Sequence, residues 1–407
     1  MKPAKKQFSI LKQVCELIPR NMVSKLAKDY EVDKKSRTFT PWSHVVSMIF
    51  AQLSHALSLN DIADALSNHK SVLTGMRRAV PPSRNGLSHA NKNRNSDMAE
   101  ALFWKVFEQL QESLPEFGLG KNHKGFPKRF KRVIHVLDSS TIQLVSNCMD
   151  WAKHRRRKAA AKLHLRLNLA SFLPGFVLVK EARTHDSTEA RALCRNIKAG
   201  EITLFDKAYV DFKHLYELEQ HTICWVTRSK DNMAYTVIKT TQSKSATILK
   251  DETIRLTGHQ SKQDYPKVMR LITAIVEVDG NRKIMTFLSN NLEWAASSIC
   301  DLYKARWAIE AFFKQLKQTL QLADFLGYSK QAVRWQIWTA LLTYLLLRFI
   351  AFKSKWQWSF SRIFTIIRGV LWSQFDLFRL LARYGTAHKP PKLIATPYQA
   401  YLPGFVF

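Results

Sequence analysis

The chain has 407 residues, of which 63 are Lys or Arg and 32 are Asp or Glu, so its formal net charge is +31 at pH 7. This excess is larger than solubility requires and favours a polyanionic partner, with nucleic acid ahead of a membrane surface. A hydrophobic content of 46%, with 24 Phe and 11 Trp, predicts folded cores in two or three domains and excludes a disordered basic protein.

The first 120 residues have the periodicity of short helices separated by turns. Apolar residues recur at helical spacing over residues 8–28, 42–57, 60–66 and 87–114. A basic cluster occupies residues 77–94 and contains two prolines. Short helices with a basic last member fit a helix-turn-helix DNA reader, although plain helical scaffolding fits almost as well. We therefore expect residues 1–120 to form a helical N-terminal DNA-binding domain.

Near residue 131 the pattern changes from helix to strand. The predicted elements are strands at 133–144, 162–170 and 175–183, a helix at 187–197, a strand ending at 206, a helix at 212–220 and a strand at 222–229. Asp138 lies toward the end of the first strand, and Asp206 ends the fourth. Three antiparallel strands followed by alternating helices and strands are the order of a ribonuclease-H-like core, so the predicted fold class is α/β with a mixed sheet.

The chain then inserts a second β-rich region at about residues 232–290 before it returns to helix. A long helix is predicted at 330–352. Its uninterrupted apolar run, at 337–347, is too short to span a bilayer and indicates a buried helix. Residues 121–352 would thus form the catalytic domain, and residues 353–407 a basic helical C-terminal region.

The most informative segment is residues 303–317, with the sequence YKARWAIEAFFKQLK. On one continuous α-helix, four polar side chains would share a stripe about 60° wide. These are Tyr303, Arg306, Glu310 and Lys317, with Lys314 beside them. An adjacent apolar stripe would anchor the helix. A metal-ligating acid among phosphate-binding cations would look like this, and so would an ordinary amphipathic helix with a solvated charged face.

Three acids on different elements could serve phosphodiester chemistry. Asp138, Asp206 and Glu310 would lie on two strand ends and a later helix. Two-metal catalysis needs about three such carboxylates converging on ions about 3.5–4 Å apart. Their hard oxygens suit Mg²⁺ or Mn²⁺, so we expect two ions per site.

The motifs around these acids resemble those of the insertion-sequence-four family of DDE transposases. The Tyr303, Arg306, Glu310, Lys317 spacing looks like the signature of that family. The blocks HVLDSST and LFDKAYVDF, which contain the first two acids, are similar to its acid blocks, and the β-rich insertion is also a feature of the group. The similarity covers roughly residues 131–352.

The resemblance implies an insertion-sequence transposase acting on DNA. It would bind the terminal inverted repeats, cut through a hairpin intermediate and join the freed ends to target DNA, with two subunits pairing the ends in a synaptic homodimer. It implies that the three acids hold the ions. It also implies that Tyr303, Arg306 and Lys317 grip backbone phosphates, although a packing role suits Tyr303 too.

Further cations are weaker candidates for DNA contacts. Lys162, Arg228 and Lys230 project from strands near the presumed active edge, and the basic run at 154–158 would form a backbone-contacting loop unless it is merely solvated. Two other functions stay open on the same fold. One is a non-catalytic DNA-binding protein, and the other is a ribonuclease-H-like nuclease without strand transfer.

Cysteine usage and the N-terminus suggest where the protein acts. The five cysteines are scattered without a C-x-x-C pair, which predicts reduced thiols rather than a disulfide framework or zinc site. The Lys-rich N-terminus lacks the apolar stretch of a secretory signal. We expect the bacterial cytoplasm, at the nucleoid, and no membrane partner.

Overall fold

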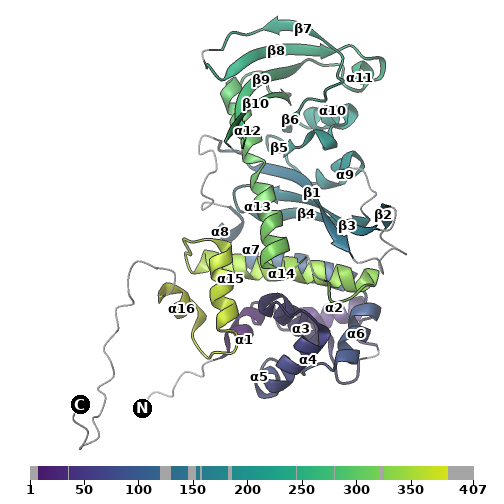
Figure 1. Cartoon of the computed structure of the whole chain (residues 1–407), viewed down its shortest axis with the longest axis vertical. Coiled ribbons are helices and arrows are strands. Elements are labelled where there is room, and N and C mark those ends of the chain that lie inside the picture. The colour runs from purple at the N-terminus through teal and green to yellow at the C-terminus, as the bar shows by residue number, and fades with distance from the viewer. Residues whose placement is uncertain are drawn as a thin grey trace, which may run out of the picture.

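The computed structural model describes residues 8–34, 36–119, 130–144, 153–155, 158–181, 186–243, 245–278, 280–320, 322 and 325–383. Across these ranges the molecule is elongated. Helices from both ends of the chain form one end, the ribonuclease-H-like part of a ten-stranded sheet lies above them, and the inserted strands form the other end (Figure 1).

The described residues before position 120 are helical, as predicted. The helices are α1 (Ile10–Cys15), α2 (Met22–Asp29), α3 (Pro41–Ser54), α4 (Leu59–Asn68), α5 (Lys70–Thr74), α6 (Arg84–Asn93), α7 (Asp97–Ser113) and α8 (Glu116–Leu119). Thr40 caps α3, with proline in its first turn, and Ser58 and Asp61 form a capping box on α4. The segments 8–28 and 87–114 each split in two. Pro19 interrupts the first, and a turn in which Asn95 accepts from the amide of Asp97 interrupts the second.

The helix α14 (Lys330–Lys353) joins this helical unit to the sheet. It packs against α3, α6 and α7, and Arg334 pairs with Asp97 at 2.7 Å and Glu100 at 2.9 Å. On the sheet side, the Tyr344 hydroxyl donates to the Phe172 carbonyl at 2.9 Å. By length and composition α14 could cross a membrane, but 83% of its most apolar window is buried inside the protein. The prediction of a buried helix is confirmed.

The strands β1 and β3 to β6 have the ribonuclease-H-like arrangement. The strands preceding the insertion are β1 (Ile134–Leu144), β2 (Lys153–Arg155), β3 (Lys158–Asn168), β4 (Leu173–Glu181), β5 (Ile202–Phe205) and β6 (Cys224–Arg228). Their spatial order is β4-β3-β1-β5-β6, with β2 also on β3. The β1–β3 and β3–β4 pairs are antiparallel, whereas β1–β5 and β5–β6 are parallel. The predicted fold class is therefore confirmed.

The insertion continues this sheet. It comprises β7 (Tyr235–Thr240), β8 (Ile248–Leu256), α11 (His259–Asp264), β9 (Met269–Val278) and β10 (Asn281–Ser289). Because β10 pairs antiparallel with β6, the order runs on as β6-β10-β9-β8-β7 (Figure 1). A buried ion pair ties β8 to β9, with Arg270 Nε and Nη2 each 2.7 Å from an oxygen of Asp251. Arg270 also donates through Nη1 to the carbonyl of Trp294, just before the next helix.

Two groups of helices cover the two faces of the sheet. On one face α9 (Asp186–Leu193) and α10 (Phe212–Gln220) pack over Leu137, Phe205 and Trp225. On the other face lie α12 (Ala296–Ala305) and α13 (Ala308–Lys314), over residues that include Val136 and Ile142. The hydrophobic core beneath α12 and α13 is continuous with the core formed by α14 and the N-terminal helices.

The expectation of one unbroken α-helix over residues 303–317 is wrong. The chain turns at Arg306 and Trp307 between α12 and α13, and residues Gln315–Thr319 form a π-helical segment. The amides of Arg306 and Ile309 bond to carbonyls three residues back instead of four. The Arg306 side chain leaves this turn toward β1, where its guanidinium bonds to Asp138. This tertiary contact outweighs the helix propensity of the segment.

The C-terminal helices return to the N-terminal unit. These helices are α15 (Phe360–Gly369) and α16 (Leu377–Arg383). The amides of Ile10 and Leu11 donate to the carbonyls of Ser373 and Leu371, at 3.1 and 2.9 Å. The two ends of the described chain therefore stabilise one helical unit. The predicted role of residues 384–407 lies outside the described residues.

Candidate active site

The first two candidate acids lie on neighbouring parallel strands. Asp206 directly follows β5. The expectation that Asp138 lies toward the end of its strand is wrong, because β1 continues to Leu144; Asp138 instead directly follows the last position of β1 that pairs with β5. In the register of this pair Leu137 is opposite Phe205, so each acid follows a paired position. Adjacent strands are about 4.8 Å apart, and the sheet therefore places the two acids side by side.

The third acid reaches the same edge from α13. Side chains alternate along β1, and Asp138 shares its face with Val136 and Ile142, which belong to the core beneath α13. Glu310 lies in the first turn of α13. The Arg306 guanidinium joins the two acids, with Nη1 2.9 Å from Asp138 Oδ2 and Nη2 3.2 Å from Glu310 Oε1. One cation is thus shared by two carboxylates.

Tyr303 links the same arginine to the second strand end. Its hydroxyl donates to Asp206 Oδ1 at 3.3 Å, and its ring centroid lies 5.5 Å from Cζ of Arg306. The ring also packs against Phe287 of β10, at a centroid distance of 5.0 Å. Tyr303 therefore packs in the core and contacts an acid at once, and the pair Tyr303 and Arg306 together touches all three acids.

The electrostatics are those of charges crowded at a partly closed edge. Burial raises the pKa of Asp138 to about 6 against the opposing charge of Arg306, and the other two acids add to the rise. Burial likewise raises the pKa of the Tyr303 phenol to about 12, so it remains a donor at neutral pH. Burial works to lower the pKa of Arg306, but the surrounding anionic groups keep it above its ordinary value. Carboxyl groups perturbed in this way are typical of functional sites.

Two backbone amides orient Asp138 and Asp206. The amide of Ser139 donates to Asp138 Oδ1 at 2.8 Å, and the amide of Lys207 donates to Asp206 Oδ1 at 2.7 Å. Neither contact could be predicted from the sequence, because every residue except proline carries the same backbone N–H donor.

The donor set fits a hard divalent cation, but its present arrangement holds an arginine. The three acids come from two neighbouring strands and a helix, and carboxylate oxygens are the ligands that Mg²⁺ and Mn²⁺ prefer. Within the described ranges no three His, Cys, Asp or Glu side chains are grouped so that they could hold a metal ion. Arg306 lies between two of the three acids and supplies the positive charge at that position.

The two signature lysines differ in their surroundings. Lys317, in the π-helical segment, donates through Nζ to the Thr141 carbonyl of β1 at 2.9 Å, and burial lowers its pKa. Lys314 is exposed one turn beyond Glu310. Lys317 therefore fixes the helix to the sheet, while Lys314 faces solvent beside the acids.

The remaining candidate cations lie at different distances from this edge. Arg228 ends β6 and is close enough to Tyr303 that, against the dominant effect of burial, its charge works to lower the phenol's pKa. Lys162 lies opposite Thr141 in the β1–β3 pair. Thr141 is three positions beyond Asp138, so Lys162 and Asp138 point to opposite faces of the sheet.

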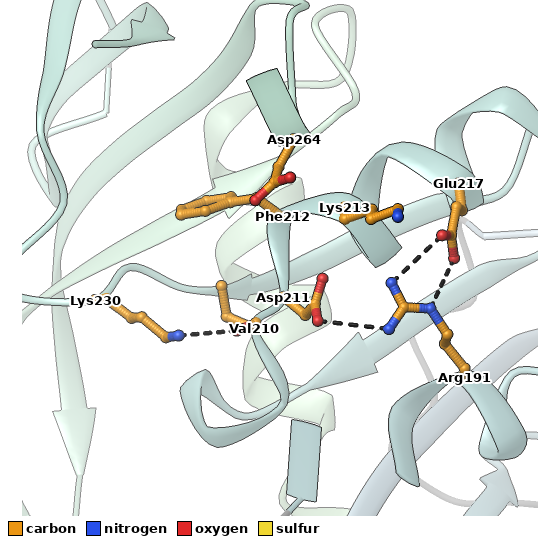
Figure 2. A pocket seen from close by; sticks show the side chains of 8 residues that line it. All are labelled: Arg191, Val210, Asp211, Phe212, Lys213, Glu217, Lys230 and Asp264. Atoms are coloured by element: carbon orange, nitrogen blue, oxygen red, sulfur yellow. Dashed lines mark hydrogen bonds and ion pairs between the residues drawn. The ribbon is translucent and has the colours of Figure 1, made fainter. Parts of the chain in front are cut away.

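Lys230 lies at a cleft of about 560 Å³ on the α10 side of the sheet (Figure 2). Its Nζ donates to the Val210 carbonyl at 2.8 Å. Across the cleft Arg191 pairs with Glu217 at 3.0 Å and with Asp211 at 3.5 Å (Figure 2). Arg191, Asp211 and Glu217 therefore neutralise one another within the protein.

Part of the N-terminal basic cluster is structural. Arg77 donates to the Ile18 carbonyl at 2.6 Å and lies over the Trp42 ring, and Arg94 donates to Ser36 Oγ at 3.0 Å. The exposed cations of this cluster are Arg78, Arg84 and Lys92. The basic run at 154–158 was expected in a loop, but residues 154 and 155 belong to β2 and residue 158 begins β3. The side chains of this run lie outside those that the structure describes.

Comparison with protein families finds a transposase domain. A family model described as "Transposase DDE domain" matches residues 129–346, and a model described only as a domain of unknown function matches residues 6–76. The first match covers the sheet, its insertion and the helix α13, and so includes all three acids.

Individual relatives carry the same description. The putative transposase y4zB of Sinorhizobium fredii is 29% identical over 67% of this chain and 72% of its own length. The probable transposase for insertion sequence element IS5377 of Geobacillus stearothermophilus is 28% identical over 58% of this chain and 61% of its own. Transposase InsG for insertion sequence element IS4 of Escherichia coli is 23% identical over 46% and 43%.

A solved structure also matches much of the chain. It is that of a piggyBac transposase synaptic complex with hairpin DNA, with a TM-score of 0.48 and 10% identity over 93% of this chain and 83% of that one.

Proposed function

Since the chain belongs to the family of DDE-domain transposases, whose model spans more than half of its length, we propose that it cuts an insertion sequence out of DNA and joins it to a target. The expected resemblance is thereby confirmed at the level of the family. The proposal adds that the protein binds the terminal inverted repeats of its element and works by cut-and-paste.

One observation carries this proposal. Asp138 and Asp206 lie side by side on parallel strands, and Glu310 reaches Asp138 through the shared Arg306. A DNA-binding protein without chemistry gains nothing from three acids at one edge, because each repels phosphate. The arrangement therefore supports catalysis over binding alone.

The three acids would hold divalent cations, Mg²⁺ or Mn²⁺, and we propose two per site. When bound there, they would supply activation of a water or 3′-hydroxyl nucleophile and stabilisation of the leaving oxygen. The amides of Ser139 and Lys207 keep one oxygen of Asp138 and one of Asp206 oriented. Tyr303 holds Asp206 in place as a hydrogen-bond donor.

DNA would approach over the cations that flank the acids. We propose that Arg306 and Lys314 contact backbone phosphates, Arg306 with two parallel hydrogen bonds and Lys314 as a point charge. Arg228 would extend this contact, whereas Lys317 acts mainly through its bond to β1. Lys162 and Lys230 point away from the acids, so their contacts would be with more distant DNA.

The partners we propose are the two element ends, target DNA and a second copy of the chain that pairs the ends. The protein would act in the bacterial cytoplasm, at the nucleoid. The large positive charge supports strong, salt-sensitive DNA binding.

A cleavage assay tests the proposal. The full chain is mixed with labelled DNA from the ends of its element and with Mg²⁺ or Mn²⁺, and the products are separated by size and topology. We expect nicked, hairpin and joined products from the wild type. Glu310→Gln should yield none, while Glu112→Gln, which changes an exposed acid of α7, should cut normally.

Each other outcome points to a different function. Binding without any cleavage at either ion would identify a non-catalytic DNA-binding protein. Cleavage of branched DNA without joined products would identify a nuclease. Normal cleavage by Glu310→Gln would show that the site assignment is wrong.

A further inference from the structure

We propose that Arg306 is a latch on the acidic site. Its guanidinium occupies Asp138 and Glu310 while DNA is absent, and in this position it opposes the binding of divalent cations. A DNA phosphate that draws Arg306 away would open the site. This inference rests on the proposed function, and it adds that DNA and metal ions bind cooperatively.

Arg306 and a divalent cation would compete for the same carboxylate oxygens. Arg306 bonds to Asp138 Oδ2 and Glu310 Oε1, and Asp138 Oδ1 already accepts from the Ser139 amide. A divalent ion drawn to these carboxylates would meet a fixed positive charge within a few ångströms, and the two cations would repel each other strongly in a partly buried site. Metal binding therefore requires the guanidinium to move.

The Arg306 guanidinium does not use all of its hydrogen-bond donors in this position. A guanidinium carries five N–H donors, and its buried Nε has no hydrogen-bond partner in the part of the chain that is described. The side chain is only 8% exposed, so water does not readily satisfy the missing bond. An unsatisfied buried donor weakens the position that Arg306 now occupies.

The Glu310 carboxylate is the partner from which Arg306 can separate most readily. The Glu310 side chain is 58% exposed, and Arg306 lies at the turn between α12 and α13, where regular helical bonding is interrupted. A small rotation at this turn would redirect the guanidinium without disturbing the core under α13.

A DNA phosphate is a suitable competitor for the arginine. It offers two oxygens that match the guanidinium fork, and its charge is not shared with a second residue. Exposed Lys314 would help to attract it. Because binding free energies are coupled reciprocally, DNA should increase metal affinity by the same factor by which metal increases DNA affinity.

The test measures metal binding directly. Free Mn²⁺ is followed by electron paramagnetic resonance as it is titrated with the full chain, with and without duplex DNA from the element end, after subtraction of the Mn²⁺ bound by DNA alone. Without DNA, Arg306→Gln should bind Mn²⁺ at least about tenfold more tightly than the wild type. With DNA, the wild type should gain most of this difference and the variant little.

Two further variants make the result specific. Lys304→Gln removes an equal charge from an exposed position on α12 and should behave like the wild type. Arg306→Lys keeps the charge but offers one nitrogen in place of a fork, so its affinity without DNA should lie between the wild type and Arg306→Gln; it also serves if Arg306→Gln does not fold.

The outcomes separate the latch from the proposed function. Equal Mn²⁺ affinity in the wild type and both Arg306 variants without DNA would overturn the latch and leave the metal site standing. Absence of Mn²⁺ binding by every protein, with or without DNA, would overturn the metal site and the latch together.

Discussion

The sheet edge that carries Asp138 and Asp206, here named the acidic edge, and the β-insertion each contain a buried arginine paired with acid. The two pairs differ in how completely the arginine is enclosed by its partners. In the insertion, Arg270 makes two 2.7 Å bonds to the single carboxylate of Asp251, and both side chains are less than a tenth exposed. At the acidic edge, Arg306 divides its bonds between Asp138 and Glu310, at 2.9 and 3.2 Å.

This difference in geometry and exposure suggests a way to distinguish a structural ion pair from a functional one. A charge pair with a matched, sealed geometry is fixed, and breaking it leaves a buried charge without compensation. A cation divided between acids that still reach solvent can be displaced by another ligand. By this criterion the insertion pair holds β8 to β9, and the Arg306 pair regulates access to the acids.

The sharpest test of this contrast is loss of chemistry without loss of fold. Asp206→Asn should reduce DNA cleavage by roughly a thousandfold or more, since groups that act on charge developing in the transition state have effects of this order. Its melting temperature should change little, because Asp206 lies at a strand end. Cleavage kinetics and thermal unfolding of the same sample would measure both, and near-normal cleavage would remove Asp206 from the site.

The insertion pair should respond in the opposite way. Asp251→Ala should lower the free energy of unfolding by about 3 kcal/mol, because Arg270 would remain buried without its partner. Urea unfolding measures this loss, with Glu293→Ala, an exposed acid before α12, as the matched control. If the folded fraction of the variant cut DNA slowly, the insertion would be part of the chemistry and the contrast would fail.

The pH dependence of stability should reveal the cost of burying the Asp138 carboxylate at the acidic edge. Burial raises the pKa of Asp138 to about 6. Between pH 4 and pH 6 the folded protein therefore retains a proton that the unfolded chain has released, and the free energy of unfolding falls as the pH rises through this window.

Comparison with Asp138→Asn isolates that contribution. From pH 4 to pH 8 the stability of the wild type should decline by about 2 to 3 kcal/mol relative to the variant, at 1.36 kcal/mol per unit of pKa shift. Urea unfolding in the presence of a chelator measures the difference. A difference that is constant with pH would mean that Asp138 is no more buried in the folded protein than in the unfolded chain.

The smallest expected effect is on DNA affinity. Arg306→Ala should weaken binding to element-end DNA by about tenfold, the effect of one charge-assisted contact. Fluorescence anisotropy at fixed salt would measure it, and Lys304→Ala would correct for the change in net charge. Unchanged affinity would place the phosphate contact elsewhere and leave Arg306 to the acids alone.

The sequence predicted most of the fold because strand and helix periods are local properties. The strands around Asp138 and Asp206 and the helix at 212–220 could be identified from neighbouring residues alone. The short strand β2 and helix α11 were missed, since segments of three and six residues carry too little pattern.

The candidate acids could be named from their motifs, but their partners could not. Arg306 and Asp138 are separated by 168 positions, and no spacing rule connects them. The bond from Lys317 to the Thr141 carbonyl joins residues 176 positions apart and involves a backbone group common to all residues. The helical stripe predicted for residues 303–317 assumed a regular rotation that the turn at Arg306 interrupts.

Local sequence patterns were enough to predict the order of the elements along the chain, the location of the insertion and the motifs that contain the three candidate acids, because each pattern involves neighbouring residues. The pairing of distant strands and the position of a single arginine between two of those acids depend on the folded chain. That position depends on where β1 and α13 meet in space, and the packing of the whole sheet against its helices sets this meeting point.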